Sequence, residues 1–295
     1  MSETTTGVVL EAALQTARSA VRPTWNNVAM SVPPPADPRR SFDGAAEIYH
    51  GIRPSYPPSM FDELFRLLPS HPIVLEVGPG TGQATRDLLS RGANVYAVEI
   101  GPAMAAKLRE VHPSPALTVV VGDFEEIALE EHGFDAVFSA TAYHWISAKA
   151  QADRPARALK PGGLVAIVDL NQISSPEDKG FFAGAQPIYE RYGQGHTGPQ
   201  APARNAVDPP IHRVLRDDRR FSNVELRAYD WDQTYSAADY RQLMLSYSGT
   251  QMMPPPARQG LLDDMVAFID ARFGGEVTRP LVVTLTMARR LTDAA

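Results

Sequence analysis

The chain has 295 residues, of which 44% are hydrophobic and 21% charged, with a formal net charge of −6 and no cysteine. This length is enough for one large buried core, alone or with a sizeable insertion. The missing cysteine excludes disulfides, thiolate metal sites and cysteine nucleophiles, and the negative charge disfavours a nucleic-acid-binding surface over the whole molecule.

No run of about 18 apolar residues is present, so we expect no stable insertion into a membrane. The first residues include Glu3 and lack the basic and apolar stretches of a secretory signal. Together with the absence of cysteine, these features favour a cytoplasmic location.

Residues 1–44 are expected to form an N-terminal extension that is partly flexible. Residues 7–18 have the spacing of a short amphipathic helix. Residues 31–38 are too rich in proline for a regular helix or a central strand. Two interpretations remain open: a loose tail, or an arm that covers the active site or a partner subunit.

Between residues 45 and 170, short apolar runs alternate with segments of helical spacing. A first helix is expected to follow a cap at Ser59. The alternation, with short connections, predicts an α/β fold whose mostly parallel, doubly wound, Rossmann-like sheet has helices on both faces. Strands are expected over residues 73–77, 95–100, 117–121, 134–139 and 164–170, and further helices over 83–90, over 102–111 and before Leu159.

Residues 171–220 interrupt this alternation with a polar stretch rich in glycine and proline. We expect an inserted lid over the mouth of the sheet, with its aromatic residues in the lid's own core. Residues 221–295 are expected to complete a seven-stranded sheet and the acceptor pocket. They contain predicted strands over 224–231 and 281–287, a helix capped by Ser236 and running through 247, and a helix over 260–273.

Three glycines, Gly78, Gly80 and Gly82, lie between the first strand and the next helix. Small residues let a ligand approach the backbone closely, and a helix N-terminus offers free N–H groups. Glu99 ends the second strand, 21 residues after Gly78, at a distance typical of a carboxylate that binds ribose hydroxyls. The spacing predicts a ligand that contains a nucleoside.

Asp123 and Phe124 end the third strand. A carboxylate there can accept a hydrogen bond from an exocyclic amine such as that of adenine, and the adjacent aromatic ring can pack on the base. The dinucleotide fingerprint would need Gly or Ala where the chain has Gln83, and no Gly-Lys-Ser/Thr follows for a P-loop.

With Glu76 before the glycines, the loop reads E-x-G-x-G-x-G, which resembles the first motif of class I S-adenosylmethionine (SAM)-dependent methyltransferases. SAM has no phosphates, and its sulfonium is a cation, so an acidic pocket suits it better than a lysine-bearing loop. The resemblance covers roughly residues 45–170 and continues through Glu99, Gly122-Asp123, residues 134–137 and residues 159–163.

A narrower resemblance links the chain to trans-aconitate methyltransferase-like enzymes of the methyltransferase type 11 group. Residues 139–145 are similar to their S-x-x-A-x-H-W segment, and residues 49–57 to their Y-x-x-x-R-P-x-Y-P segment. The residues around Ser246 and Tyr247 and the final helix and strand are also similar. Residues before 44 have no counterpart.

By position, this resemblance implies a SAM site in which Tyr49 and Arg53 line the methionine end of the cofactor, while Glu99 binds its ribose. His144 and Trp145 would lie beside the transferred methyl group, and His144 and Tyr49 are the candidate catalytic residues. The complete set of implied cofactor-binding residues is Tyr49, Arg53, Glu76, Gly78, Gly80, Gly82, Glu99, Ile100, Met104, Asp123, Phe124, Ala140, His144 and Trp145.

Each of these assignments has a structural alternative. Tyr49 could cap the core through a satisfied hydroxyl group, and Arg53 could form a surface ion pair. His144 could be a structural histidine hydrogen-bonded near the strand end, and Trp145 could serve packing alone. No spacing of histidines and carboxylates predicts a metal ion.

The sequence therefore predicts a SAM-dependent methyltransferase that modifies an oxygen, carboxylate or hydroxyl, of a small-molecule acceptor. A carboxylate acceptor needs no general base and could be clamped by Arg53 or Arg191, whereas a hydroxyl acceptor would use His144 as the base. The alternatives are C-methylation of an isoprenoid or quinone, and SAM binding without turnover. The sequence does not predict an oligomeric state.

Overall fold

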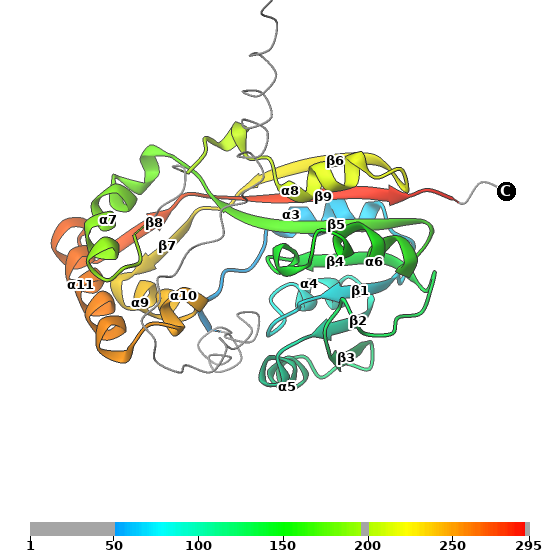
Figure 1. Cartoon of the computed structure of the whole chain (residues 1–295), viewed down its shortest axis with the longest axis horizontal. Helices are drawn as coiled ribbons and strands as arrows, with labels where there is room; N and C mark the ends of the chain where they lie inside the picture. Colours follow the sequence, from blue (N-terminus) through cyan, green and yellow to red (C-terminus); the bar gives the residue numbers. More distant parts are fainter. Residues whose placement is uncertain (1–50, 196–200, 293–295) are drawn as a thin grey trace, which may run out of the picture. The chain divides into compact units, whose positions relative to one another are not determined.

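The computed structural model describes residues 51–195 and 201–292. Its main feature is a seven-stranded sheet in the order β3-β2-β1-β4-β5-β9-β6, in which β9 runs in the direction opposite to the other six strands (Figure 1). The predicted fold class is confirmed. The strands are β1 (Ile73–Val77), β2 (Asn94–Glu99), β3 (Leu117–Val121), β4 (Phe134–Ala140), β5 (Leu159–Gln172), β6 (Phe221–Asp230) and β9 (Leu281–Arg290).

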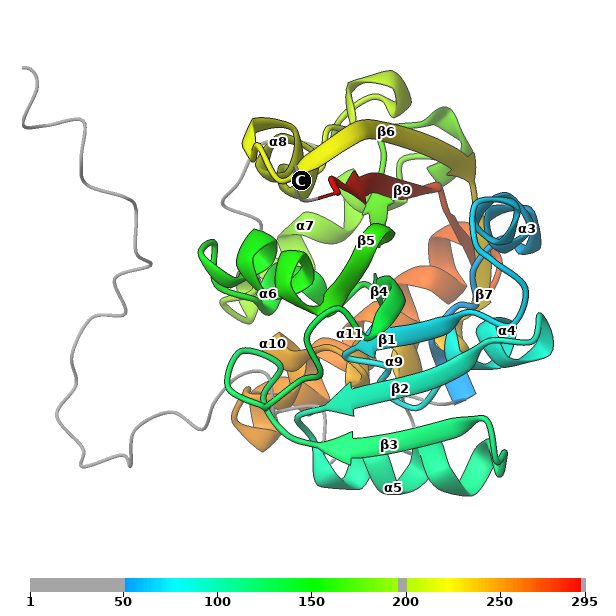
Figure 2. The ribbon, with the colours of Figure 1, turned by 90° about the vertical axis from the view of Figure 1, so that its right-hand side faces the viewer.

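Helices cover both faces of this sheet (Figure 2). On one face, α3 (Pro58–Arg66), α4 (Thr85–Ser90) and α5 (Pro102–Val111) bury Met60, Leu88 and Leu108 against the strands. On the other, α6 (Ala150–Ala158) and α8 (Pro210–Asp217) bury Ala152 and Ile211. Because successive strand residues point to opposite faces, each buried strand contributes to both cores. No helix in these described ranges is long and apolar enough to cross a membrane.

Two helix starts differ from the expectation. The first helix, α3, begins at Pro58 with Pro57 as its cap, so Ser59 is not the cap residue. Proline at the first helical position replaces a capping side chain, because its fixed φ suits the helix. The next helix, α4, begins at Thr85 rather than at residue 83, because Gly82 at φ +97° prolongs the loop.

Beside the parallel sheet lies a second layer, which we call the helical cap. It comprises α7 (Phe181–Arg191), α9 (Ala237–Leu245), α10 (Ser248–Gln251) with the residues that join it to α9, α11 (Pro255–Phe273), and a two-stranded antiparallel sheet of β7 (Gln233–Ser236) and β8 (Glu276–Arg279). Its core is aromatic: the fully buried Phe181 lies 5.1 Å from the ring centroid of Tyr240. Ser236 caps α9 as predicted, its hydroxyl accepting from the Asp239 N–H at 3.1 Å.

The expected insertion, residues 171–220, does not pack as one lid. Its first part, with η5 (Pro176–Asp178) and α7, joins the helical cap. Its last part, α8, packs on the sheet through Ile211 and Leu215, while η6 (Arg204–Ala206) lies between them. The cap is completed by residues 233–279, which the sequence assigned to the sheet and the acceptor pocket. The sequence pattern did not predict α8, because the few apolar residues of this helix stand among polar ones.

Candidate functional site

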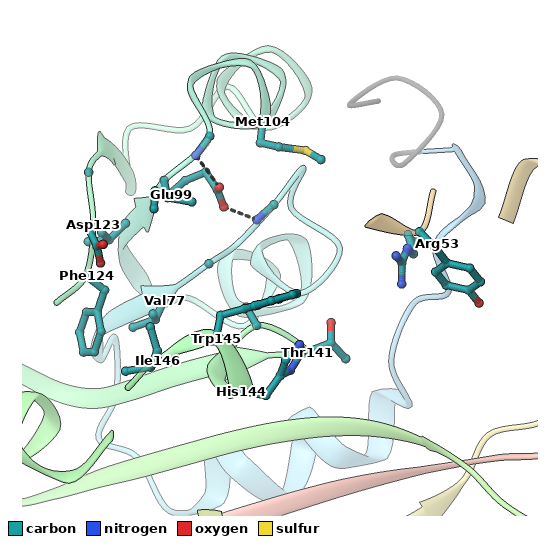
Figure 3. Close-up of a pocket in the computed structure, with 18 residues that line it drawn as sticks. Arg53, Val77, Glu99, Met104, Asp123, Phe124, Thr141, His144, Trp145 and Ile146 are labelled. Atoms are coloured by element: carbon teal, nitrogen blue, oxygen red, sulfur yellow. Dashed lines mark hydrogen bonds between the residues drawn. The ribbon is translucent and has the colours of Figure 1, made fainter. Parts of the chain in front are cut away.

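A cavity of about 260 Å³ opens at the carboxyl ends of β1, β2, β3 and β4, as expected for a parallel α/β sheet (Figure 3). The ends of these strands and the loops after them form most of its walls, and Arg53 and Tyr247 contribute the rest. Of the residues predicted for the site, those that line it are Arg53, Gly78, Gly80, Glu99, Ile100, Met104, Asp123, Phe124, His144 and Trp145.

Glu99 is held at the cavity wall by the backbone on both sides of it. One carboxylate oxygen accepts a hydrogen bond from the Gly80 N–H at 2.9 Å, and the other accepts from the Gly101 N–H at 2.8 Å. Gly101 is the cap residue of α5, so the carboxylate also faces the positive end of that helix. The side chain is 6% exposed. These contacts fix one orientation of the carboxylate at the cavity wall.

The three motif glycines have different environments. A side chain on Gly78, at φ +65°, would place its Cβ 2.5 Å from the Cβ of Ala142, so the loop lies directly against the β4 side of the cavity. Gly80, at φ +58°, lines the cavity. Gly82 faces away from it, and a Cβ there would meet the His112 ring at 2.5 Å. The absence of a side chain at Gly82 therefore allows α5 to pack closely against this loop.

Asp123 and Phe124 form the end of the cavity that lies across from Arg53 (Figure 3). The Oδ1 atom of Asp123 accepts from the Glu125 N–H at 2.9 Å, which holds the carboxylate in a turn. Phe124 is 3% exposed, lies 6.4 Å from the Tyr143 ring centroid and lies under the Arg154 guanidinium at 5.3 Å. A rigid aromatic wall thus adjoins a carboxylate.

Glu76 lies beside the main cavity rather than in it. Its carboxyl group is 1% exposed and accepts a hydrogen bond from the Thr85 hydroxyl at 2.7 Å. Burial raises the pKa of Glu76 to about 8, and the nearby Glu99 adds to the shift. The Glu76 carboxyl group therefore holds a proton more readily than an ordinary glutamate does. Glu76 lines a smaller cavity of about 30 Å³ together with Ala140.

His144 and Trp145 belong to η4 (Tyr143–Trp145), which follows β4. Their ring centroids are 5.1 Å apart. The His144 side chain reaches solvent, but the protein around it removes enough water to lower the pKa of its imidazole below the ordinary value. Its ring is therefore neutral at pH 7 and can accept a proton.

The helical cap reaches the cavity through Tyr247. The guanidinium carbon of Arg53 lies 4.8 Å from the Tyr247 ring centroid, and Arg53 donates a hydrogen bond to the Ser246 carbonyl at 2.9 Å. Arg191, the other arginine expected at the acceptor, is 63% exposed and bound to Asp264 at 2.5 Å. It does not line the cavity. Tyr49 lies outside the described residues.

The pocket residues that the sequence reasoning did not assign fall into two groups. Most are small or apolar neighbours of assigned positions, and proximity to the motifs could have indicated them. Tyr247 belongs to the helical cap. The only sequence signal for it was the similarity of the residues around Ser246 and Tyr247 to trans-aconitate methyltransferase-like enzymes. The complete set is Val77, Val98, Gly101, Gly122, Thr141, Ala142, Ile146 and Tyr247.

Residues 75–167 match the family model of a methyltransferase domain. About a third of the chain is therefore similar to a methyltransferase domain. The match begins within β1 and ends within β5, so it contains the loops after β1, β2, β3 and β4 that build the cavity. Arg53 and Tyr247, on the cap side, lie outside the matched region.

Curated relatives support the same domain. An uncharacterized methyltransferase of Mycobacterium tuberculosis is 38% identical over 128 residues, covering 43% of this chain and 51% of the relative. A malonyl-[acyl-carrier protein] O-methyltransferase of Halorhodospira halophila is 32% identical over 179 residues, covering 58% of this chain and 56% of the relative. The chain thus spans about half the length of the curated relatives it matches.

Solved structures support the fold. A putative type II methyltransferase from Anaeromyxobacter dehalogenans superposes with a TM-score of 0.52 at 22% identity, over 81% of this chain and 97% of that one. A putative methyltransferase from Anabaena variabilis gives a TM-score of 0.52 at 17% identity, over 77% and 96%. The cofactor of class I methyltransferase domains is SAM, and the cavity fits it: close glycine backbone, two carboxylates and an aromatic wall.

Proposed function

We propose that this chain is a methyltransferase that transfers the methyl group of SAM to an oxygen atom of a small-molecule acceptor. The observation that carries the proposal is the cavity itself. It has the nucleoside-binding features of Glu99, Asp123 and Phe124 at one side and Arg53 and Tyr247 of the cap side at the other. A ligand in this cavity is therefore covered by the cap, which favours a compact acceptor.

The residues for the cofactor follow from this layout. Figure 3 shows Arg53 across the cavity from Asp123 and Phe124. We assign Asp123 and Phe124 to the adenine and Glu99 to the ribose, because a carboxylate at the end of the second strand can accept hydrogen bonds from ribose hydroxyls. Arg53 and Tyr49 are assigned to the methionine end, whose carboxylate is complementary to a guanidinium.

The remaining predicted residues have supporting positions in this assignment. Gly78 and Gly80 form the floor, where a side chain would occupy the space of the ligand or of Ala142. Ile100 and Met104 supply apolar surface to the wall. Glu76, Gly82 and Ala140 support the loops from outside the cavity. We infer no direct contact between these three and SAM.

SAM supplies an activated methyl group on a sulfonium leaving group, so the protein's part is alignment and exclusion of water. The neutral imidazole of His144 can take the proton from a hydroxyl acceptor as its oxygen attacks. A carboxylate acceptor is already ionised and needs no such step. Trp145 packs beside His144 and shields the ring from water on that side.

The narrower similarity at residues 139–145 and 49–57 favours an acceptor of the kind used by trans-aconitate methyltransferase-like enzymes. The second candidate, C-methylation of an isoprenoid or quinone, would use exposed lid aromatics. Phe181 is instead fully buried in the cap, which weighs against it. A SAM-binding protein without turnover is the third candidate.

A product screen separates these candidates. The full chain is incubated with SAM labelled in the methyl group and with a metabolite extract, and labelled products are identified by mass. The proposal expects a small labelled product that is a methyl ester, which releases methanol in base, or a methyl ether, which does not. A carbon-bound methyl group would support the second candidate. No product from a protein that binds SAM would support the third.

A further inference from the structure

Within the helical cap, Arg279 has no carboxylate partner among the residues that the structure describes. This residue ends β8, and its guanidinium Nη1 donates to the Tyr247 hydroxyl at 2.6 Å. Its Nη2 donates to Oε1 of Gln172 at 3.3 Å, and the guanidinium lies 5.9 Å from the Phe182 ring centroid. The Nε atom is shielded from solvent and has no hydrogen-bond partner. A sheltered cation held only by neutral groups is costly unless an anion joins it.

Four tyrosines surround this arginine: Tyr189, Tyr235, Tyr240 and Tyr247. The Tyr235 hydroxyl is buried without a hydrogen-bond partner. The Tyr189 and Tyr240 hydroxyls lie 3.3 Å apart, so one of the two protons is not used between them. Burial raises the pKa of Tyr189, Tyr235 and Tyr240, which keeps these hydroxyls protonated at neutral pH. We call the five residues the arginine–tyrosine cluster.

The fold brings the arginine–tyrosine cluster together from separate elements. In the two-stranded sheet of β7 and β8, Gln233 pairs with Arg279 and Tyr235 with Val277, so Tyr235 and Arg279 are diagonal neighbours on the same face. Tyr240 comes from α9 and Tyr189 from α7, while Tyr247 follows α9. Residues separated by 90 positions therefore build one polar group inside an aromatic core.

The cluster has more hydrogen-bond donors than acceptors. A guanidinium carries five N–H donors and no acceptor, and each protonated tyrosine adds one O–H. The Arg279 Nε and the Tyr235 hydroxyl are the donors left over in shielded positions. A carboxylate or phosphate group, which only accepts, is the complement of such a set and pairs with arginine in a bidentate manner. Arg279, Tyr189 and Tyr247 are only half-buried, which leaves an approach for it.

Tyr247 connects this cluster to the cofactor cavity. Its side chain lines the cavity, while its hydroxyl is bound by Arg279, which does not line the cavity. We propose that the arginine–tyrosine cluster binds an anionic group, carboxylate or phosphate, of the methyl acceptor, at a place separate from the atom that receives the methyl group. This inference rests on the proposed methyltransferase function and adds the charge class of its substrate.

The test measures binding rather than turnover. Succinate, inorganic phosphate and uncharged succinamide are each titrated calorimetrically into the full chain saturated with S-adenosylhomocysteine, at constant ionic strength. We expect saturable binding of at least one anion and none of succinamide. The Arg279→Gln change should weaken that binding at least about tenfold, since charge-assisted hydrogen bonds are lost. The control Arg191→Gln removes an exposed arginine of the same cap and should stay within about twofold.

A second variant guards against misfolding of Arg279→Gln. Tyr235→Phe removes only a buried, unpaired hydroxyl, so its thermal stability should equal or exceed that of the wild type. Anion affinity should nevertheless fall several-fold, and a purely structural role for the hydroxyl would leave it unchanged. The proposal is overturned if neither anion binds, if succinamide binds equally well, or if anion affinity in Tyr235→Phe stays within twofold of wild type. SAM binding to the same proteins, measured without S-adenosylhomocysteine, distinguishes this failure from failure of the methyltransferase proposal.

Discussion

The cofactor side of the cavity and its cap side are built in different ways. On the cofactor side, the groups that face the cavity include glycine backbones, a carboxylate fixed by two backbone N–H groups, and the side chains of Asp123 and Phe124. All of them lie at or just after the carboxyl ends of β1, β2 and β3. On the cap side, long side chains such as Arg53 and Tyr247 come from distant parts of the chain. One side is defined by local backbone geometry, and the other by the tertiary packing of side chains.

This difference suggests that the cofactor side determines SAM binding and the cap side determines the choice of acceptor. A backbone-built wall changes little when single side chains change, which suits a cofactor shared by many enzymes. A side-chain-built wall can change with few substitutions, and acceptor choice depends on such regions. Substitutions on the cofactor side should therefore affect SAM binding, whereas those on the acceptor side should affect turnover with SAM binding retained.

The largest effect is expected for Glu99→Ala. The change removes the carboxylate that accepts from Gly80 and Gly101 and that we assign to the ribose, so SAM affinity should fall by at least about 100-fold. Isothermal titration measures the affinity, and Glu110→Ala, an exposed glutamate of α5, is the control. Unchanged affinity in folded Glu99→Ala would show that the ribose is bound elsewhere.

The next effect concerns His144. If its neutral imidazole is the base for a hydroxyl acceptor, His144→Ala should lower kcat by about 100-fold while SAM affinity stays within about threefold. In the wild type, kcat/KM should rise with pH through a pKa below 6.5, because desolvation lowers that pKa and the neutral form is active. His212→Ala, on α8, is the control. If the turnover of His144→Ala stays within about twofold of the wild type, His144 is not the general base.

A smaller effect is expected for Gly78→Ala. Its Cβ would lie 2.5 Å from Ala142 at a positive φ, so the loop must shift, and SAM affinity should fall about tenfold. Gly162→Ala has a similar φ of +76° but open space around the Cβ, so it shares the conformational cost without the clash. Chemical denaturation and calorimetry of both variants separate the two contributions. Equal SAM affinities would mean that close approach at Gly78 is irrelevant to the ligand.

The last prediction concerns stability rather than binding, and it is the pH dependence that Glu76 confers. Its folded pKa of about 8 exceeds the ordinary 4.5, so between these values the folded state holds a proton that the unfolded state has released. The unfolding free energy should therefore fall with rising pH across this window, by on the order of 1 kcal/mol per pH unit from this group. Glu76→Gln, which mimics the protonated form, should remove that component. Urea denaturation at pH 5.5 and 7.5 measures it, and identical pH dependence in both proteins would refute the shift.

The sequence predicted the sheet well because apolar runs and turn residues are local signals. All seven strands of the main sheet were expected, and Glu99, Asp123 and Phe124 lie around one cavity because parallel strands bring their carboxyl ends to one edge. Gly82 could not be separated from Gly78 and Gly80 by spacing alone, because only the packing of α5 decides which way each glycine faces.

The cap could not be predicted in the same way. Arg191 and Arg279 both belong to the helical cap, yet Arg191 pairs with Asp264 at the surface and Arg279 lies among tyrosines. The difference depends on the pairing of β7 with β8 and on the packing of α7 and α9, which join residues far apart in the chain. The protonated state of Glu76 likewise depends on burial that no spacing reveals.

Calorimetric titration of SAM into the full chain tests the central claim most directly. The account predicts one saturable site per chain, competition by S-adenosylhomocysteine, and loss of the binding heat in Glu99→Ala but not in Glu110→Ala. No binding of SAM to a protein that circular dichroism finds folded would contradict the account.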